Sequence, residues 1–159
     1  MKHIFQITIV LFALSANAQD TLLLLKPARV FDGNVMHPNW QVLVQKDRII
    51  TVGENLKTNL PVRIINLPNA TLLPGLIEGH SHLLLHPYNE TTWNDQVLQE
   101  SRAERIARAT VHARNTLLAG FTTVRDLGTE GADYDDVGLK KAIEKGIIIG
   151  PRIDRKSVV

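Results

Sequence analysis

NATLLPGLIEGHSHL, residues 69–83, is the stretch that decides the fold of this 159-residue chain. It contains the turn-forming pair Pro74-Gly75, and an apolar strand is predicted directly after that pair, over residues 76–84. His80 and His82 stand near the end of the strand, and side chains two positions apart on a strand point to the same face. The two imidazole rings can therefore reach one metal ion.

The segments on either side of this stretch differ in pattern. Upstream, short β-rich runs alternate with turn residues, which predicts a small β-domain. Its expected strands cover residues 22–25, 28–31, 41–45, 48–52 and 62–67. Downstream, the expected order is loop, helix, strand and helix, over residues 86–95, 101–118, 121–126 and 136–145. Strands separated by helices at this spacing indicate a parallel sheet covered by helices.

The helix predicted over residues 101–118 is amphipathic. Its apolar residues recur at helical spacing and are expected to face the sheet: Ile106, Ala109, Ala113 and Leu117. The polar residues opposite them are expected to lie in solvent: Arg105, Arg108 and His112. His112 is therefore interpreted as a surface residue.

A His-x-His pair is a weak sign of a metal site when it stands alone, because most such pairs lie on surfaces or pack in cores. Its place here strengthens the case, since the functional side chains of a parallel α/β barrel gather at the C-terminal ends of the strands. The chain contains no cysteine, so nitrogen and oxygen atoms must hold any metal. Such ligands suit zinc, while manganese, cobalt, nickel and iron stay open.

Several neighbouring residues have two interpretations each. Glu78 shares the strand face of the two histidines and either supports one of them as a hydrogen-bond acceptor or is a structural carboxylate. His86 either lines a substrate pocket or is an ordinary loop histidine. Two aromatic residues stand in the same loop, Tyr88 and Trp93.

The end of the second predicted strand poses a similar choice. Arg125 and Asp126 point to opposite faces of the strand, so if the sheet closes into a barrel, at most one of them faces its mouth. Asp126 is either a positioning group there or, as the default interpretation, the partner of a salt bridge on the helix side.

Four parts of the chain carry, in order, a resemblance to one family. They are RVFDG at 29–33 with QKDRIITVG at 45–53, NATLLPGLIEGHSHL at 69–83, LLAGFTTVRDLG at 117–128, and GPR at 150–152. The sequence resembles the amidohydrolase superfamily, in which a Pro-Gly pair precedes the first barrel strand and its His-x-His pair. Within that superfamily, TTVRDLG is similar to the branch of Xaa-Pro dipeptidases and imidazolonepropionase-like hydrolases.

The resemblance implies an α/β fold in which a small β-sandwich domain precedes the start of a (β/α)8 TIM barrel. Residues 19–73 would belong to the β-domain and residues 74–153 to the first βα units of an incomplete barrel. His80 and His82 would bind the more buried metal of a site with one or two ions, with zinc expected. The family's other ligands are a carboxylated lysine, two histidines and an aspartate. They have no matching position here, and no catalytic residue is assigned.

The implied activity is hydrolysis of C–N bonds in amides, peptides or cyclic amides by metal-activated water, on a small-molecule or dipeptide substrate. A second hypothesis is a secreted, non-catalytic β-rich binding module whose histidines are incidental. A third is a member of the superfamily that kept the barrel and lost its metals. Stoichiometric metal in the intact protein would separate the first hypothesis from the second.

Both ends of the chain have distinct patterns. Residues 1–18 are predicted to be an export signal, because Lys2 precedes an apolar run and Ala16-Asn17-Ala18 fits a cleavage site. The mature protein is expected to be secreted or periplasmic, outside any membrane. The formal net charge is +2 and no basic patch is present, which argues against a nucleic-acid partner.

The last six residues, DRKSVV at 154–159, break the family pattern and are expected to be non-native. They match what a common sequencing-library adapter encodes in one reading frame. A closed barrel needs about 250 residues, so the chain is expected to be an N-terminal piece that is inactive alone.

Overall fold

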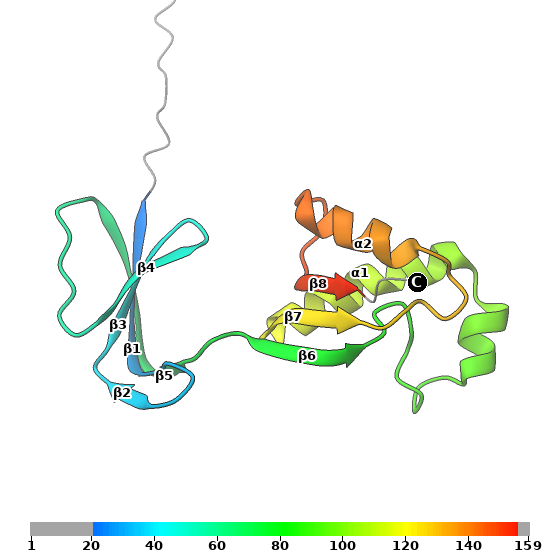
Figure 1. Ribbon diagram of the computed structural model, residues 1–159, viewed down its shortest axis with the longest axis horizontal. Coiled ribbons are helices and arrows are strands. Elements are labelled where there is room, and N and C mark those ends of the chain that lie inside the picture. The colour runs from blue at the N-terminus through cyan, green and yellow to red at the C-terminus, as the bar shows by residue number, and fades with distance from the viewer. Residues whose placement is uncertain (1–20, 156–159) are drawn as a thin grey trace, which may run out of the picture. The chain divides into compact units, whose positions relative to one another are not determined.

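A computed structural model of the chain describes residues 21–155. These residues form two compact units, divided between Leu73 and Pro74, and each unit is described by itself (Figure 1). The predicted export signal and the last four residues of the chain lie outside the described residues. Between residues 21 and 155, no helix combines the length and the apolar character that a membrane span requires.

The N-terminal unit is a five-stranded mixed sheet. Its strands are β1 (Leu22–Phe31), β2 (Met36–Pro38), β3 (Gln41–Gln45), β4 (Arg48–Gly53) and β5 (Val62–Leu72). β1 pairs antiparallel with β2 and β3 and parallel with β5, while β4 pairs antiparallel with β3. The core is built from alternate residues of β1, since Leu22 and Leu24 are buried together with Leu43.

The sheet departs from the predicted strands in three places. β1 joins two runs that the sequence separates, because a register shift next to Pro27 lets β1 and β5 continue past a residue that has no N–H. The sequence pattern does not predict β2, which is too short for a period to appear. β5 runs on to Leu72 beside β1. The described strands of this unit make one sheet, so the second layer of the expected β-sandwich is not among them.

The C-terminal unit alternates strands and helices. Its elements are β6 (Leu76–Ser81), the π-helix η1 (Asp95–Gln99), α1 (Arg102–Leu118), β7 (Phe121–Asp126), α2 (Asp135–Glu144) and β8 (Arg152–Arg155). The three strands are parallel in the order β6-β7-β8, which confirms the predicted parallel sheet. GPR at 150–152 leads into β8, as expected of the approach to a third strand.

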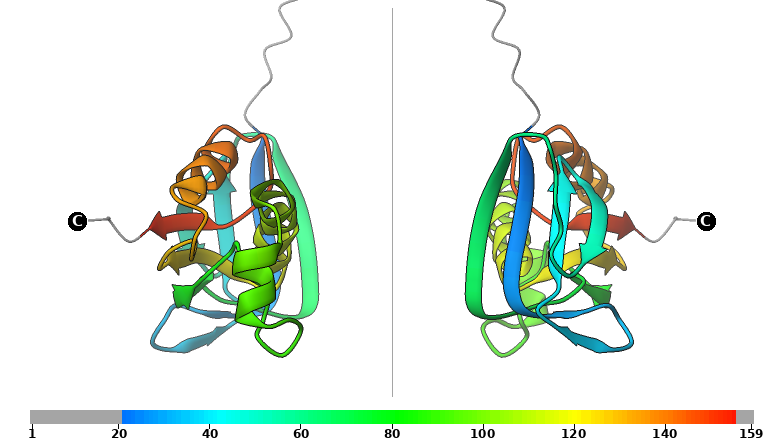
Figure 2. Two further views of the ribbon diagram at one scale, coloured as in Figure 1. Left: turned by 90° about the vertical axis from the view of Figure 1, so that its right-hand side faces the viewer. Right: turned by 90° about the vertical axis from the view of Figure 1, so that its left-hand side faces the viewer.

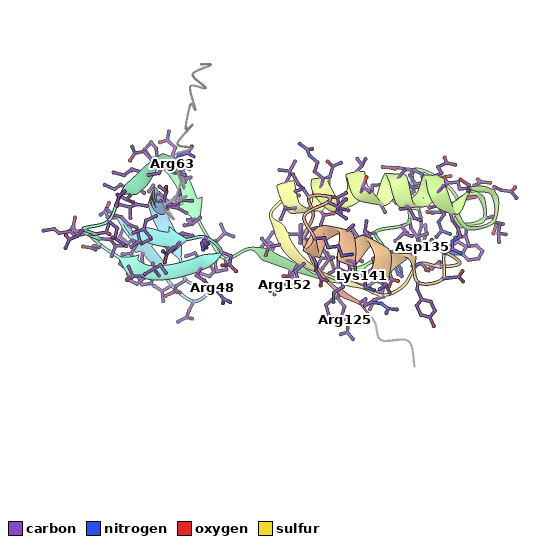
Figure 3. The ribbon with its side chains drawn as sticks, turned by 90° about the horizontal axis from the view of Figure 1, so that it is seen from above. Arg48, Arg63, Arg125, Asp135, Lys141 and Arg152 are labelled. Carbon is purple, nitrogen blue, oxygen red and sulfur yellow. The ribbon has the colours of Figure 1, made fainter. Side chains whose placement is uncertain are left out.

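Both long helices cover the same face of this sheet (Figure 2). Ala109 of α1 and Leu139 of α2 are buried in one cluster with Val124 of β7 and Ile153 of β8. The opposite face carries Arg125 among its exposed residues (Figure 3). In the C-terminal unit, helices therefore cover one face of the sheet, and the other face is exposed to solvent.

The buried face of α1 differs from the predicted one. Ala109 and Ala113 are fully buried as expected, but Ile106 is 37% exposed and Arg105 is 1% exposed. The expectation that Arg105 lies in solvent is wrong, because its guanidinium donates to the carbonyl oxygens of Thr129 and Glu130. The buried face is thus shifted by about one residue along the helix.

β6 ends three residues before the predicted strand does. After Ser81 the chain turns, and the Leu85 N–H donates to the carbonyl oxygen of His82 at 3.0 Å. Leu83 and Leu84 are buried in the helix-side core instead of extending the strand. Their apolar character predicts burial correctly but not the element to which they belong.

β8 contains Asp154 and Arg155, the first two residues of the segment that is expected to be non-native. They pair with Arg125 and Asp126 of β7, and the Arg155 Nε donates to Asp136 at 3.0 Å. The non-native origin of residues 154–159 stays a prediction.

Candidate functional site

The two histidines predicted to bind metal lie where β6 ends. His80 is the penultimate residue of the strand, and His82 is the first residue after it. Their ring centroids are 5.3 Å apart with an interplanar angle of 62°. The structure therefore brings the two imidazoles close together, and one of them is on the loop and not on the strand.

The His82 imidazole is oriented by a backbone carbonyl. Its Nδ1 lies 2.8 Å from the Gly128 oxygen, which follows β7. A carbonyl oxygen only accepts hydrogen bonds, so Nδ1 must carry the hydrogen and the neutral ring keeps its lone pair on Nε2. Metal-binding histidines usually make such a bond through the nitrogen that does not bind the metal. Gly128 has φ +137°, a backbone conformation that favours glycine.

A carboxylate that the sequence analysis does not single out lies beside the same ring. Glu130 Oε1 is 3.9 Å from His82 Nε2, and its other oxygen accepts a hydrogen bond from Trp93 Nε1. Glu130 itself has φ +45°, which is uncommon for a residue with a side chain. The only sequence signal for Glu130 is its position in the loop that follows β7.

Glu78 bonds to the backbone of a candidate ligand. Its Oε1 accepts the His80 N–H at 3.0 Å. Among the described residues this bond goes to the main chain of His80 and not to an imidazole ring, so the choice between the two interpretations of Glu78 stays open. The His80 side chain itself is exposed.

Asp126 is fully buried at the end of β7. Its Oδ2 accepts the Leu83 N–H at 3.1 Å, and its Oδ1 accepts the Gly128 N–H at 3.0 Å. The default interpretation of a helix-side salt bridge is wrong for the described part of the chain, where both oxygens accept from backbone amides. Burial raises the pKa of Asp126, although the two amides oppose this shift.

His86 is held among carboxylates. Its Nδ1 is 3.4 Å from Glu90 and its Nε2 is 3.3 Å from Glu100, while its backbone N–H donates to the buried Gln96. The residues that line an adjacent pocket include His80, His82, His86, Tyr88, Glu90 and His112. Trp93, the second aromatic residue of this loop, is not among the residues that line the pocket. The substrate role of His86 stays a prediction.

The prediction that His112 is a solvated surface residue is wrong. Its Nδ1 lies 3.1 Å from the Leu83 oxygen and donates to it, and its ring is 6.1 Å from that of His86. Arg108 is also only 14% exposed, with Nη2 2.6 Å from Glu100. Helix α1 thus turns two of its supposed solvent residues towards the loop after β6. A helical pattern alone could not reveal this, because the partners are loop carbonyl and carboxylate groups.

Within residues 21–155, no group of three or more His, Cys, Asp or Glu side chains is arranged to hold a metal ion. The fit of the pair His80 and His82 to a metal therefore rests on their donor atoms. Two imidazole nitrogens suit zinc, and the hydrogen bond of His82 Nδ1 leaves Nε2 as its ligand atom. The described residues can supply part of a metal site.

Comparisons with known proteins place the chain in a family. The sequence model described as "Amidohydrolase family" matches residues 71–159, more than half of the chain. The chain belongs to the amidohydrolase family. No curated protein matches it.

Solved structures of other amidohydrolases resemble the chain. A Xaa-Pro dipeptidase with methionine bound in its active site has a TM-score of 0.71 and 26% identity, covering 85% of this chain and 33% of that one. A prolidase complexed with N-methylphosphonate-L-proline has a TM-score of 0.70 and 28% identity, covering 85% and 31%. A further amidohydrolase has a TM-score of 0.71 and 28% identity, covering 86% and 31%. The chain spans about a third of the length of these three proteins.

Proposed function

We propose that this amidohydrolase chain supplies the first metal-binding strand of a hydrolase that cleaves C–N bonds. Family membership and the similarity to a dipeptidase and a prolidase support this class of reaction. The observation that carries the proposal is the pair of imidazoles at the C-terminal end of β6. One of them, His82, has its Nδ1 engaged by Gly128 and its Nε2 left as a ligand atom.

The cofactor proposed is a divalent metal, zinc in the first place, as one or two ions. His80 and His82 would hold it, and the Gly128 carbonyl would keep the His82 ring in the binding orientation. When bound, such a metal activates water and polarises the carbonyl group under attack. The remaining ligands are expected from residues outside the described part of the chain.

We further propose that β6, β7 and β8 are the first three strands of a (β/α)8 barrel that follows a β-sandwich domain. Their parallel order and the helices on one face are typical of that fold. The barrel also explains why His80 and His82 stand at the C-terminal end of β6, where barrel enzymes place their active sites.

The proposed substrate is a small amide, with dipeptides of the Xaa-Pro type as the first class to test. The solved structures of a Xaa-Pro dipeptidase and a prolidase support this choice. His86 is proposed as a substrate contact from the loop after β6, because it lines the pocket that also contains His80 and His82.

Substitution of the two histidines tests the function. In the full-length protein, His80→Ala and His82→Ala are expected to lower zinc affinity about 100-fold or more, because each removes a metal ligand while even supporting residues are typically worth 10- to 100-fold. Zinc content after gel filtration and hydrolysis of Xaa-Pro dipeptides are the measurements.

His37→Ala is the matched control, since His37 pairs with Asp32 in the N-terminal unit and should leave bound zinc unchanged. Full zinc occupancy in a variant that carries both His80→Ala and His82→Ala would contradict the proposal. It would favour a binding module with incidental histidines.

We also propose that the protein is exported and acts outside the cytoplasm, as a secreted or periplasmic enzyme. The support is the signal-like pattern of residues 1–18. The intact mass of the exported protein is expected to correspond to a chain that starts at Gln19, cyclised or not. A soluble exported product that retains residues 1–18 would refute the proposal.

A further inference from the structure

A closed set of hydrogen bonds surrounds the loop that carries His82. Asp126 accepts the N–H of Leu83, the residue directly after His82, at 3.1 Å, and the N–H of Gly128 at 3.0 Å. The carbonyl of the same Gly128 then accepts the His82 Nδ1–H at 2.8 Å. The Asp126 carboxylate thereby holds the backbone next to His82 directly, and it holds the His82 side chain indirectly through Gly128.

The strand ends reinforce this connection. Ser81 and Asp126 are partners in the β6–β7 register, and the Leu127 N–H donates to the Ser81 oxygen at 2.9 Å. Asp126 is fully buried, so its two accepted bonds are shielded from competition with water. The segments after β6 and β7 are thus joined through Ser81 and Leu83, the residues on either side of His82.

A purely structural carboxylate would be expected to pair with a cation in such a buried place, because an unpaired buried charge is costly. Among the described residues, Asp126 has no such ion pair, and its two oxygens accept from backbone amides of two different loops. Burying a carboxylate without an ion pair costs free energy. The position of Asp126 is better explained by the two backbone segments that it holds in place.

We propose that Asp126 is a positioning residue that fixes the orientation and tautomer of His82 through Gly128. The proposal rests on the proposed function, in which His82 binds a metal. Asp126 does not touch the metal or the substrate. Its two bonds set the direction of the Gly128 carbonyl, which keeps the hydrogen on Nδ1 and the lone pair on Nε2.

The substitution Asp126→Asn tests this in the full-length protein. The new amide group keeps one accepting oxygen but turns an NH2 group towards a backbone N–H, so one of the two bonds is replaced by a repulsive contact. Two changes are expected in Asp126→Asn. Zinc affinity, measured by competition with a chelator, falls about 10- to 100-fold. The 15N resonances of the His82 ring in metal-free protein change from a single Nδ1–H tautomer to a mixture.

Asp136→Asn is the matched control, because Asp136 is also buried in the C-terminal unit but its Oδ1 accepts from the Val137 N–H and not from the loops around His82. It is expected to leave zinc affinity and the His82 tautomer unchanged. Gly128→Ala is the second variant: its Cβ meets open space, so it acts only through the backbone at φ +137°. We expect it to show the same two changes as Asp126→Asn.

The outcomes separate the two proposals. Wild-type zinc affinity together with a wild-type His82 tautomer in Asp126→Asn would overturn the positioning role and leave the proposed function intact. If Asp126→Asn does not fold, wild-type zinc affinity and a wild-type His82 tautomer in Gly128→Ala would overturn the positioning role. A wild-type protein that binds no zinc would instead overturn the proposed function, while the tautomer measurement would still decide the role of Asp126.

Discussion

Asp32 organises the turn between β1 and β2 through both of its carboxylate oxygens. Oδ1 accepts the N–H groups of Asn34 and Val35 at 2.8 and 2.7 Å, and Oδ2 lies 2.8 Å from His37 Nε2. The bond to Val35, followed by those to His37 and Asn34, lowers the pKa of Asp32 from 3.8 to about 2. The ionised carboxylate is thus the form that the folded turn prefers.

This shift predicts how stability depends on pH. The folded pKa of Asp32 is below its unfolded value, so its contribution is complete above pH 3.8 and is lost as the pH falls from 3.8 towards 2. Between pH 4 and 2, the stability of the wild-type protein is expected to fall more steeply than that of Asp32→Asn. Urea denaturation followed by Trp40 fluorescence, in a Trp93→Phe background, measures both slopes.

Asp47→Asn is the control for this comparison, because Asp47 is exposed and its ion pair with Arg48 is long, at 3.9 Å. The stability of the Asp47→Asn protein should fall between pH 4 and 2 as steeply as that of the wild type. Equal slopes for wild type and Asp32→Asn would contradict the prediction.

Single residues also show how far the sequence can locate the site. The closeness of the His80 and His82 side chains could be predicted, because two histidines two positions apart at the end of an apolar run are visible in the sequence itself. Arg105 and His112 could not, because a cation or an imidazole on a helix looks like a solvent residue. What buries them here is a set of carbonyl oxygens from the loops after β6 and β7. Those acceptors belong to tertiary structure, which a helical period does not contain.

At the scale of elements, turn residues made some boundaries predictable. β3 and β7 begin and end at the predicted residues, since Gly120 precedes β7 and Lys46-Asp47 follows β3. The start of β6 at Leu76 was predicted as well, but its end at Ser81 and the whole of η1 were not. The buried residues Leu83 and Leu84 look like a continued strand in sequence. The turn there is held by tertiary hydrogen bonds, such as the one from the Leu83 N–H to Asp126, which the sequence pattern does not contain.

The contact between the two helices and the start of β8 depends on Gly150. A Cβ atom at this position would lie 2.6 Å from the Ile143 Cδ1 and 3.0 Å from the Ala113 Cβ. Gly150→Ala is therefore expected to destabilise the C-terminal unit by about 1–3 kcal/mol, as overpacking of a core usually does. Chemical denaturation of the full chain gives the free energy of unfolding.

Gly138→Ala on α2 is the matched control, because a Cβ there meets nothing within 4 Å. In a helix this change is expected to stabilise by about 0.5–1 kcal/mol. Both substitutions replace glycine with alanine, but they should change the free energy of unfolding in opposite directions. A Gly150→Ala protein as stable as the Gly138→Ala protein would show that the space around Gly150 is not limiting.

At the scale of the whole molecule, the parallel sheet of the C-terminal unit has one uncovered face. Ile77 on β6 is 73% exposed. Parallel sheets occur almost only with both faces covered. We expect further chain to cover this face in the full-length protein, a view supported by the chain's coverage of only 31% to 33% of three solved structures that it resembles.

The last prediction concerns the 159-residue chain expressed alone. With this face in solvent, it is expected to self-associate, to bind the dye ANS and to show no amide hydrolysis, because exposed apolar surface drives association and two histidines do not complete a metal site. Ile77→Thr should reduce both the association seen by light scattering and the ANS signal. Ile147→Thr should change neither, since Ile147 is equally exposed, at 70%, but lies in the connection between α2 and β8. A monomeric 159-residue protein that binds no ANS and hydrolyses amides with added zinc would contradict the prediction, and it would place the missing ligands within this chain.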